Sequence, residues 1–211
     1  MPAHRIHLVR HGEVHNPERV LYGRLEGFHL SPRGRLMTRA AADELVAAGD
    51  PVRSLVVSPL LRTRESAEPI AEAFRLDPVV DERVIEPSNF FEGTTIRRAL
   101  RNPINWLVLR RPGVPSWGEP YTRIVERMMA AVEDAWASAD GGDVVIVSHQ
   151  LPIWMVHRHV SGLPLKHDPR ERRCGLSSIT TLERSGDRFV EVGYRDPAVE
   201  IAADGVDVGA V

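Results

Sequence analysis

The chain has 211 residues, with 27 basic and 29 acidic residues and a formal net charge of −2. This length predicts one domain with a full hydrophobic core, and the charge balance argues against a nucleic-acid-binding protein, which normally has a basic excess. Because the apolar runs are too short for a membrane span and the first residues do not resemble a signal peptide, we expect a cytoplasmic protein without membrane or nucleic-acid partners.

The first half of the chain alternates short apolar runs with amphipathic segments. Ser31 followed by Pro32 is typical of a helix start, and Gly49 is typical of a helix end. Short apolar runs bounded by turn residues predict buried strands. The elements expected here are a strand at 6–9, a helix at 32–48, a strand at 54–58, a helix at 59–74 and a short strand at 78–80.

The second half begins with an irregular stretch and then returns to the same alternation. Gly118 and Pro120 precede a long amphipathic segment that ends at Gly141. The expected elements are helices at 96–100, 104–110, 120–139 and 151–160, and strands at 143–147, 176–182 and 189–194. We expect one domain over residues 1–195 and a flexible C-terminal tail over residues 196–211, which are rich in Ala, Gly and Asp.

Strands that alternate with helices predict an α/β fold, here a three-layer α/β/α sandwich with a mostly parallel central sheet. Ligands of such sheets bind beyond the carboxyl ends of the strands. The residues that follow the three clearest strands include two arginines and two histidines: Arg10 and His11, then Arg62, then His149. The sequence therefore predicts that these four side chains lie at one edge of the sheet.

Two arginines and two histidines at one point are suited to phosphate chemistry. Guanidinium groups match phosphoryl oxygens in shape and charge, and a neutral imidazole is a competent nucleophile toward phosphorus. Nearby guanidinium charge keeps an imidazole neutral, and a second, protonated histidine could stabilise the transferring group without a metal. This reasoning leaves the acid for the leaving group unassigned.

Three other phosphoryl-transfer chemistries are absent from the sequence. The single cysteine, Cys174, has Thr180 rather than an arginine six positions later, so a cysteine-based phosphatase is excluded. The only lysine is Lys166, which lies in no phosphate-binding Gly-Lys-Ser/Thr loop, and no Asp-x-Asp pair indicates an aspartyl-phosphate enzyme. One cysteine also rules out an internal disulfide.

The segment 8–13, Leu-Val-Arg-His-Gly-Glu, resembles the signature of the histidine phosphatase superfamily, also called the phosphoglycerate mutase-like family. Further segments resemble the family's blocks in the right order and cover nearly the whole chain: residues 57–67, 81–86 with 91–93, 118–119 with Arg127, and 147–149. The resemblance implies the phosphoglycerate mutase-like version of the α/β/α sandwich.

The resemblance also implies a role for each residue of the site. His11 would be the phosphorylated nucleophile, and Arg10 and Arg62 would clamp the phosphoryl oxygens. His149 would stabilise charge on the transferring group, and Glu86 would protonate the leaving oxygen and then activate water. Glu82 and Glu92 are the local rivals of Glu86, and no metal or other cofactor is expected.

Departures from the family pattern concern substrate recognition more than chemistry. Val14 stands where relatives have Thr, and Gln150-Leu151-Pro152 replaces a common Gly-Gly. The residues expected to bind substrate are Gly12, Asn16, Gly23 and Gln150. Most arginines at positions 97, 98, 101, 110 and 111 are expected to be solvated, as is the surface loop 170–173, whereas Trp106 and Trp117 are expected in the core.

The function expected from these residues is a metal-independent phosphatase that hydrolyses small phosphomonoesters through a phosphohistidine intermediate. One alternative is a phosphoglycerate mutase, in which the phosphoryl group returns to bound substrate. Such mutases that use a bisphosphoglycerate primer have a longer insert than the 63 positions between Glu86 and His149, which favours the phosphatase. A lesser alternative is a non-catalytic binding protein on the same fold. The oligomeric state does not follow from the sequence.

Overall fold

The computed structural model describes residues 1–95, 98, 101, 105 and 118–202. Its strands are β1 (Arg5–Arg10), β2 (Val52–Val57), β3 (Val79–Val80), β4 (Asp143–Ser148), β5 (Ile179–Ser185) and β6 (Arg188–Arg195). Its helices are α1 (Pro32–Ala48), α2 (Leu61–Phe74), α5 (Tyr121–Ser138), α6 (Gln150–Val160) and α7 (Val199–Ala202), with short 3-10 helices η1 (Glu82–Val84) and η2 (Pro169–Glu171).

The six strands form one mixed sheet in the order β3-β2-β4-β1-β5-β6. The pairs β3–β2, β2–β4 and β4–β1 are parallel, whereas β5 runs antiparallel to β1 and β6 antiparallel to β5. The α/β prediction with a mostly parallel sheet is therefore confirmed. The parallel part places the ends of β1, β2 and β4 at the same edge.

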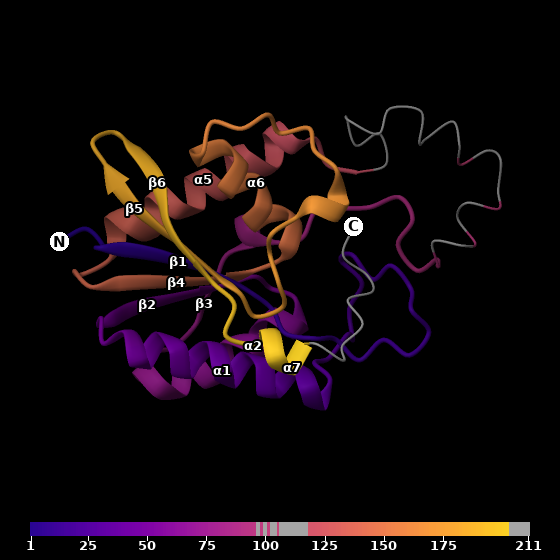
Figure 1. Cartoon of the computed structure of the whole chain (residues 1–211), viewed down its shortest axis with the longest axis horizontal. Coiled ribbons are helices and arrows are strands. Elements are labelled where there is room, and N and C mark those ends of the chain that lie inside the picture. Colours follow the sequence, from indigo (N-terminus) through magenta and orange to yellow (C-terminus); the bar gives the residue numbers. More distant parts are fainter. Residues whose placement is uncertain (96–97, 99–100, 102–104, 106–117, 203–211) are drawn as a thin grey trace.

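Helices cover both faces of the sheet, with α5 and α6 on one side and α1, α2 and α7 on the other (Figure 1). Strand β4 shows why helices must pack on both faces of the sheet: successive side chains of a strand point to opposite faces, and those of β4 are apolar on both. Val144 and Ile146 belong to the core beneath α5 and α6, while Val145 and Val147 belong to the core beneath α1 and α2. All four are completely buried.

Helix α1 begins and ends where the sequence predicted. The Ser31 hydroxyl accepts a hydrogen bond from the Gly34 backbone N–H at 2.9 Å, Pro32 occupies the first turn, and Gly49 ends the helix with a φ of 78°. A left-handed φ is readily adopted by glycine, so the cap carries no steric strain. This cap matters for function because the first turn of α1 packs against the loop after β1.

Two of the element starts that differ from the prediction have a clear local cause. Helix α2 begins at Leu61 rather than Pro59, because Leu60 keeps an extended backbone with a ψ of 141°. Strand β5 begins at Ile179 rather than at residue 176, because Ser177 has a φ of 58° and a left-handed residue cannot continue a strand.

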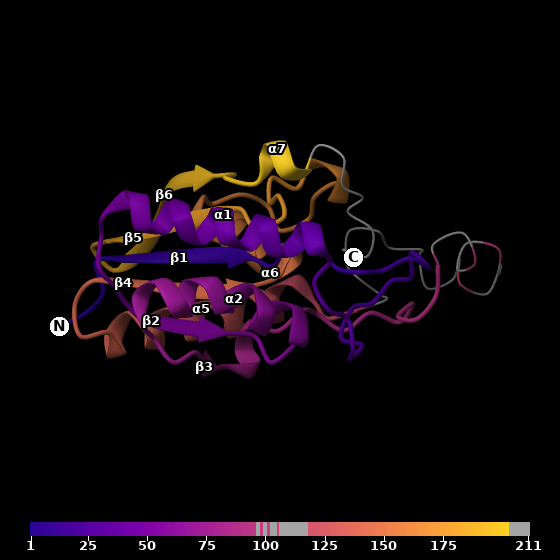
Figure 2. The same cartoon turned by 90° about the horizontal axis from the view of Figure 1, so that it is seen from below.

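Residues 198–202 belong to the segment predicted as a C-terminal tail, and they pack against α1. Ala198 is completely buried, and α7 lies beside α1 (Figure 2), where it joins a small apolar cluster with Met37. Burial of these apolar groups orders the chain to residue 202 at least. Whether the preceding 195 residues fold alone stays a prediction.

The expected helices at 96–100 and 104–110 lie outside the described residues, apart from single positions, as do Trp106, Trp117 and the arginines at 97, 110 and 111. Arg98 and Arg101 are described, and both are exposed. In the part of the chain that the structure describes, no helix has the length and apolar character needed to cross a membrane.

Candidate active site

The candidate site lies where β1, β4 and β2 end at the same edge of the sheet. His11 follows β1, His149 follows β4 and Ser58 follows β2. Backbone hydrogen bonds continue the strand pairing past the strand ends, because the N–H of His11 donates to Ser148 O and the N–H of Ser58 donates to Val147 O, both at 3.1 Å. The three side chains are therefore fixed by the sheet itself.

The two imidazoles face each other, as the sequence predicted. Their ring centroids lie 5.3 Å apart at an angle of 63°, and both rings are almost completely buried. His11 Nδ1 lies 2.8 Å from the carbonyl oxygen of Gly12. Because a carbonyl oxygen only accepts, Nδ1 carries the proton, and Nε2 holds the lone pair of the neutral ring.

The carbonyl of Gly12 is held in place by close packing of α1 and α2. Its backbone N–H donates to Ser66 Oγ at 3.1 Å, and a Cβ at position 12 would lie 2.5 Å from Gly34 O. No residue with a side chain fits at that distance. Gly12 therefore orients the His11 ring, while its expected contact with substrate stays a prediction.

His149 is held in the opposite tautomer. Arg62 Nη2 lies 3.3 Å from Nδ1 and can only donate, so Nδ1 accepts, and Nε2 donates its proton to Ser58 Oγ at 2.8 Å. Burial first, and then the charge of Arg62, hold the pKa of His149 well below its ordinary value. These two causes favour the neutral form of His149, and the stabilisation of a transferring group by a protonated His149 stays a prediction.

The same forces act on His11. Burial is the largest cause, followed by the charges of Arg62 and Arg10, and together they hold its pKa well below the ordinary value for histidine. His11 is therefore a neutral imidazole at neutral pH. Its deprotonated Nε2 has the electronic character that a nucleophile needs.

Arg10 and Arg62 are both buried, with exposed fractions of 0% and 1%. Arg10 Nη1 donates to the carbonyl of Cys174 at 2.7 Å, and Arg62 Nη2 donates to the carbonyl of Gly23 at the same distance. The Arg62 guanidinium also lies over the Tyr22 ring, 4.7 Å from its centroid. Two buried cations beside two neutral imidazoles make an environment that favours an anion.

Glu86 completes the cluster. Ser148 Oγ donates to the carbonyl of Val84 at 2.7 Å, which ties the end of η1 to the end of β4. Glu86 Oε2 lies 3.5 Å from His149 Nδ1, and its buried Oε1 has no hydrogen-bond partner among the described residues. Burial raises the pKa of Glu86 although Arg62 and Arg10 oppose the shift, so the carboxyl is suited to hold a proton.

The two rival glutamates have other surroundings. Glu82 is exposed on η1. Glu92 Oε1 accepts hydrogen bonds from the backbone N–H groups of Arg24 at 3.1 Å and Asn89 at 3.0 Å, which ties two loops together. Of the three glutamates, Glu86 alone is buried against His149.

The other residues expected to bind substrate have mostly structural contacts. The Asn16 side chain exchanges hydrogen bonds with the backbone of Val20 at 2.8 and 3.1 Å and closes its own loop. Gly23 supplies the carbonyl that accepts from Arg62, at a φ of 37°. Gln150 begins α6, and its Nε2 lies 3.5 Å from the Cys174 carbonyl. Their part in binding stays a prediction.

Sequence reasoning gave no role to several residues that the structure brings to the site. Ser58 and Tyr22 contact His149 and Arg62, although Ser58 falls within a matching family segment. Arg172, expected on a surface loop, is half-buried, and its positive charge lowers the pKa of Glu86. No local pattern signals the contact of Arg172 with Gln150, since it joins separate parts of the chain.

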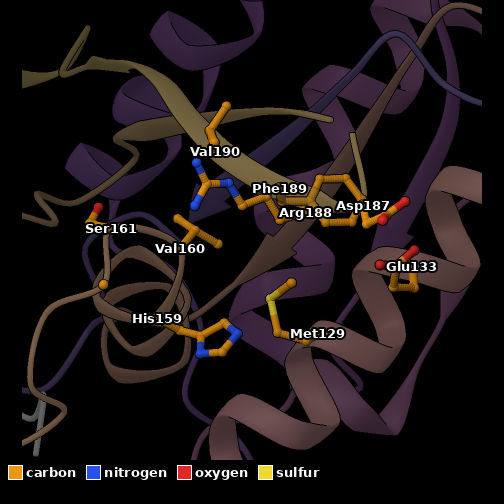
Figure 3. Close-up of a pocket in the computed structure, with 10 residues that line it drawn as sticks. Met129, Glu133, His159, Val160, Ser161, Asp187, Arg188, Phe189 and Val190 are labelled. Carbon is orange, nitrogen blue, oxygen red and sulfur yellow. The ribbon is translucent and has the colours of Figure 1, made fainter. Parts of the chain in front are cut away.

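A separate cavity of about 630 Å³ lies between α5, the end of α6 and the start of β6. Figure 3 shows Met129 and His159 on its helical side and Arg188 on the strand side. None of the residues that line it belongs to the His11–His149 cluster. Among the residues described, no group of three or more His, Cys, Asp or Glu side chains is arranged as a metal site.

The chain matches a protein-family model and is similar to several known proteins. The model of the histidine phosphatase superfamily (branch 1) matches residues 6–197. An uncharacterized protein of Mycobacterium tuberculosis is 48% identical over 197 residues, which cover 92% of this chain and 96% of the relative. A probable phosphoglycerate mutase of Proteus mirabilis is 28% identical over 83% of this chain and 84% of its own.

A solved structure shows a similar fold. The mycobacterial glucosyl-3-phosphoglycerate phosphatase, determined in complex with inorganic phosphate, superposes with a TM-score of 0.71. The match covers 90% of this chain and 96% of the phosphatase, with 26% sequence identity. The similarity therefore extends over most of both chains.

Proposed function

The chain belongs to the histidine phosphatase superfamily, and on this basis we propose that it is a metal-independent phosphatase that hydrolyses phosphomonoesters through a phosphohistidine on His11. One observation carries the proposal: His11 is buried in a neutral tautomer with its Nε2 lone pair free of the proton, between two buried arginines. Structural similarity to a phosphatase bound to inorganic phosphate supports it.

In the first step, His11 Nε2 attacks phosphorus, the new N–P bond forms, and the P–O bond to the leaving group breaks. Arg10 and Arg62 hold the equatorial oxygens. Their positive charges neutralise the negative charge on these oxygens, and their hydrogen bonds align the phosphoryl group for the transfer. The negative charge of a bound phosphoryl dianion favours the protonated form of His149, and the charged imidazole stabilises the transferring group without giving up its proton.

Glu86 supplies the proton that the leaving oxygen takes as its bond to phosphorus breaks. The resulting carboxylate then accepts a proton from water as the water oxygen attacks phosphorus and the N–P bond breaks. Inorganic phosphate leaves, and both His11 and Glu86 return to their starting states. One carboxyl therefore serves first as acid and then as base, as its raised pKa allows.

The direct test is to trap the intermediate. Wild-type protein is mixed with a ³²P-labelled phosphomonoester and quenched in alkali, in which phosphohistidine survives, and the label is located by peptide mapping. We expect label on His11 and a loss of several powers of ten in kcat in His11→Ala. The matched control is His15→Ala, an exposed histidine of the same loop, which should keep its activity. Label elsewhere, or undiminished turnover in His11→Ala, contradicts the proposal.

A mutase-type phosphoryl transfer is the second candidate, favoured by the 28% identity to a probable phosphoglycerate mutase. Both reactions pass through the same intermediate and differ in whether water or bound substrate receives the phosphoryl group. Incubation with 3-phosphoglycerate separates them, since a phosphatase releases inorganic phosphate and a mutase forms the 2-phospho isomer. We expect phosphate release.

A further inference from the structure

Glu86, the acid of the proposed reaction, lies in a stretch of chain outside the helices and strands. Residues 85–88 form an irregular loop after η1, and Pro87 has no N–H with which to anchor it. The Glu86 side chain is nevertheless buried, with Oε2 3.5 Å from His149 Nδ1. Contacts from outside the loop are therefore needed to hold the carboxyl in this place.

Two arginines hold the main chain of this loop. Arg24 Nε donates to the carbonyl oxygen of Glu86 itself at 2.6 Å, and Arg127 Nη1 donates to the carbonyl oxygen of Arg83 at 2.6 Å. Hydrogen bonds from a charged donor are roughly twice as strong as those between neutral groups. Arg24 comes from the segment between β1 and α1, and Arg127 from α5. Together they fix the backbone that carries the Glu86 side chain.

The carboxylate of Glu119 joins the two guanidinium groups. Its Oε1 and Oε2 accept from Arg127 Nε and Nη2 at 2.9 and 3.0 Å, and Oε2 also lies 3.5 Å from Arg24 Nη2. All three side chains are partly buried, where water screens ion pairs less than at exposed positions. The shared carboxylate orients both arginines. We call Arg24, Glu119 and Arg127 the Glu119 cluster.

Arg24 also adjoins the residue that holds Arg62. The carbonyl of Gly23 accepts from Arg62 Nη2 at 2.7 Å, and the backbone N–H of Arg24 donates to Glu92 Oε1 at 3.1 Å. Two neighbouring residues therefore contact Arg62 through a carbonyl and the Glu86 loop through a side chain. This connection matters because an acid must lie within hydrogen-bond reach of the oxygen that it protonates.

We infer that the Glu119 cluster, through the contact of Arg24 with the Glu86 carbonyl, positions the Glu86 carboxyl against the leaving oxygen of the substrate. The inference rests on the proposed phosphatase function and deepens it. Arg24, Glu119 and Arg127 are positioning residues that act through Glu86, not catalytic residues. A misplaced acid slows the reaction of a substrate whose leaving group needs a proton, and it has little effect where the leaving group needs none.

Two substrates with different leaving groups test this inference. Glycerol 3-phosphate has an alkoxide leaving group that must be protonated, whereas p-nitrophenolate leaves from p-nitrophenyl phosphate without a proton. The values of kcat and KM on both substrates are measured for wild type, Arg24→Gln, Arg24→Lys and Glu119→Gln. The matched control is Arg39→Gln, since Arg39 is an exposed arginine of α1 that pairs with Glu72 at 3.7 Å.

In Arg24→Gln we expect kcat on glycerol 3-phosphate to fall by roughly 10- to 100-fold, as a displacement of about 1 Å can cause, with little change in KM or in kcat on p-nitrophenyl phosphate. Arg24→Lys should recover part of the loss, since lysine keeps a charged donor without the fork. Glu119→Gln should show the same dependence on the leaving group, because it releases both arginines. Arg39→Gln should match wild type on both substrates.

A double-mutant cycle shows whether Arg24 acts through Glu86. In the Glu86→Gln background no acid is left to position, so adding Arg24→Gln should cause little further loss of kcat on glycerol 3-phosphate. A further loss as large as in the wild-type background would overturn the inference. Equal losses on both substrates in the single variants would also overturn it, and in either case the phosphatase function stands.

Failure of the proposed function has a different signature. If wild type releases no phosphate from either substrate, the phosphatase proposal fails and the inference fails with it. Circular dichroism and turnover of p-nitrophenyl phosphate show whether each variant has folded. If Arg24→Gln does not fold, Arg24→Lys takes its place in both the substrate comparison and the cycle, because it keeps the positive charge beside Glu119.

Discussion

The two imidazoles of the site hold their protons on opposite nitrogens, and neighbouring groups decide which. The Gly12 carbonyl fixes the proton of His11 on Nδ1, whereas Arg62 and Ser58 fix that of His149 on Nε2. The lone pair of His11 is therefore on Nε2, which is the atom that the proposed nucleophilic attack requires. Assignment of roles between two histidines follows here from hydrogen-bond direction, which sequence spacing alone does not contain.

Glu86 gives the most specific prediction at the scale of single residues. Because burial raises its pKa, the proton needed by a poor leaving group is lost as the pH rises through that value. In Glu86→Gln we expect kcat on glycerol 3-phosphate to fall by roughly 100- to 10,000-fold. The loss on p-nitrophenyl phosphate should be much smaller, since p-nitrophenolate leaves without a proton.

The pH profile provides the second measurement for Glu86. Wild type should lose activity on the acid side as His11 becomes protonated, and on the alkaline side as Glu86 ionises; the Gln variant should lack the alkaline decline. Glu82→Gln is the matched control, because Glu82 is exposed on η1. Equal losses on both substrates would assign Glu86 a structural role instead.

The limits of sequence reasoning are clearest at this residue scale. Arg10, His11 and His149 follow strong apolar strands, so their meeting at one edge could be predicted from strand ends. Glu86 required a family resemblance, because it lies in an irregular segment with no periodicity. Arg172 was predicted to lie in a surface loop. A run of charged residues does not reveal that this arginine contacts His167 and Gln150.

At the scale of elements, α1 sets the position of the loop that carries His11. Gly12 and Gly34 let the first turn of α1 approach this loop: a Cβ at position 34 would lie 2.1 Å from the carbonyl oxygen of Glu13. The side chains support the same contact, because Ser31 Oγ donates to Glu13 Oε1 at 2.6 Å. Close helix–loop packing of this kind depends on backbone atoms that cannot move aside.

Gly34→Ala tests this packing. Alanine normally stabilises a helix by about 1 kcal/mol relative to glycine, so propensity alone predicts a gain. We expect the opposite, a loss of about 1–3 kcal/mol in the free energy of unfolding together with lower kcat, because the clash displaces either α1 or the His11 loop. Urea unfolding and turnover of p-nitrophenyl phosphate measure the two effects.

The control for this variant is Gly193→Ala in β6, where a Cβ would meet its nearest neighbour at 3.9 Å, an ordinary contact. That change should alter stability little and activity not at all, since β6 lies at the far edge of the sheet. A stabilised and fully active Gly34→Ala would show that α1 does not position the site.

At the scale of the whole molecule, the order of elements was predictable because each parallel strand carries its own local signal. Residues 144–147 are apolar in succession, as expected for a strand buried on both faces, and Ser31 and Gly49 bound α1. The position of the last strands and of α7 was harder to predict. Their boundaries depend on Ser177 and Ala198, whose backbone and burial are set by tertiary packing.

The burial of the site has a cost for the whole molecule that depends on pH. His11, His149 and His167 all have lowered pKa values, chiefly through burial. In the unfolded chain they take up protons near pH 6.5, so the unfolded state binds more protons than the folded state below that pH. The raised pKa of Glu86 acts in the opposite direction, but it is one group against three.

We therefore expect the free energy of unfolding to fall as the pH is lowered from 7.5 to 5.5, by up to about 1.4 kcal/mol per pH unit for each excess proton bound by the unfolded chain. Urea unfolding in buffers without phosphate measures it. In His149→Gln one of the three groups is removed, and the dependence on pH should become shallower, whereas exposed His15→Ala should keep the wild-type slope. A free energy of unfolding that rises as the pH is lowered over this range would contradict this expectation. It would mean that the folded site binds protons, so that the imidazoles of His11 and His149 are charged. His11 would then lack the neutral ring that nucleophilic attack requires.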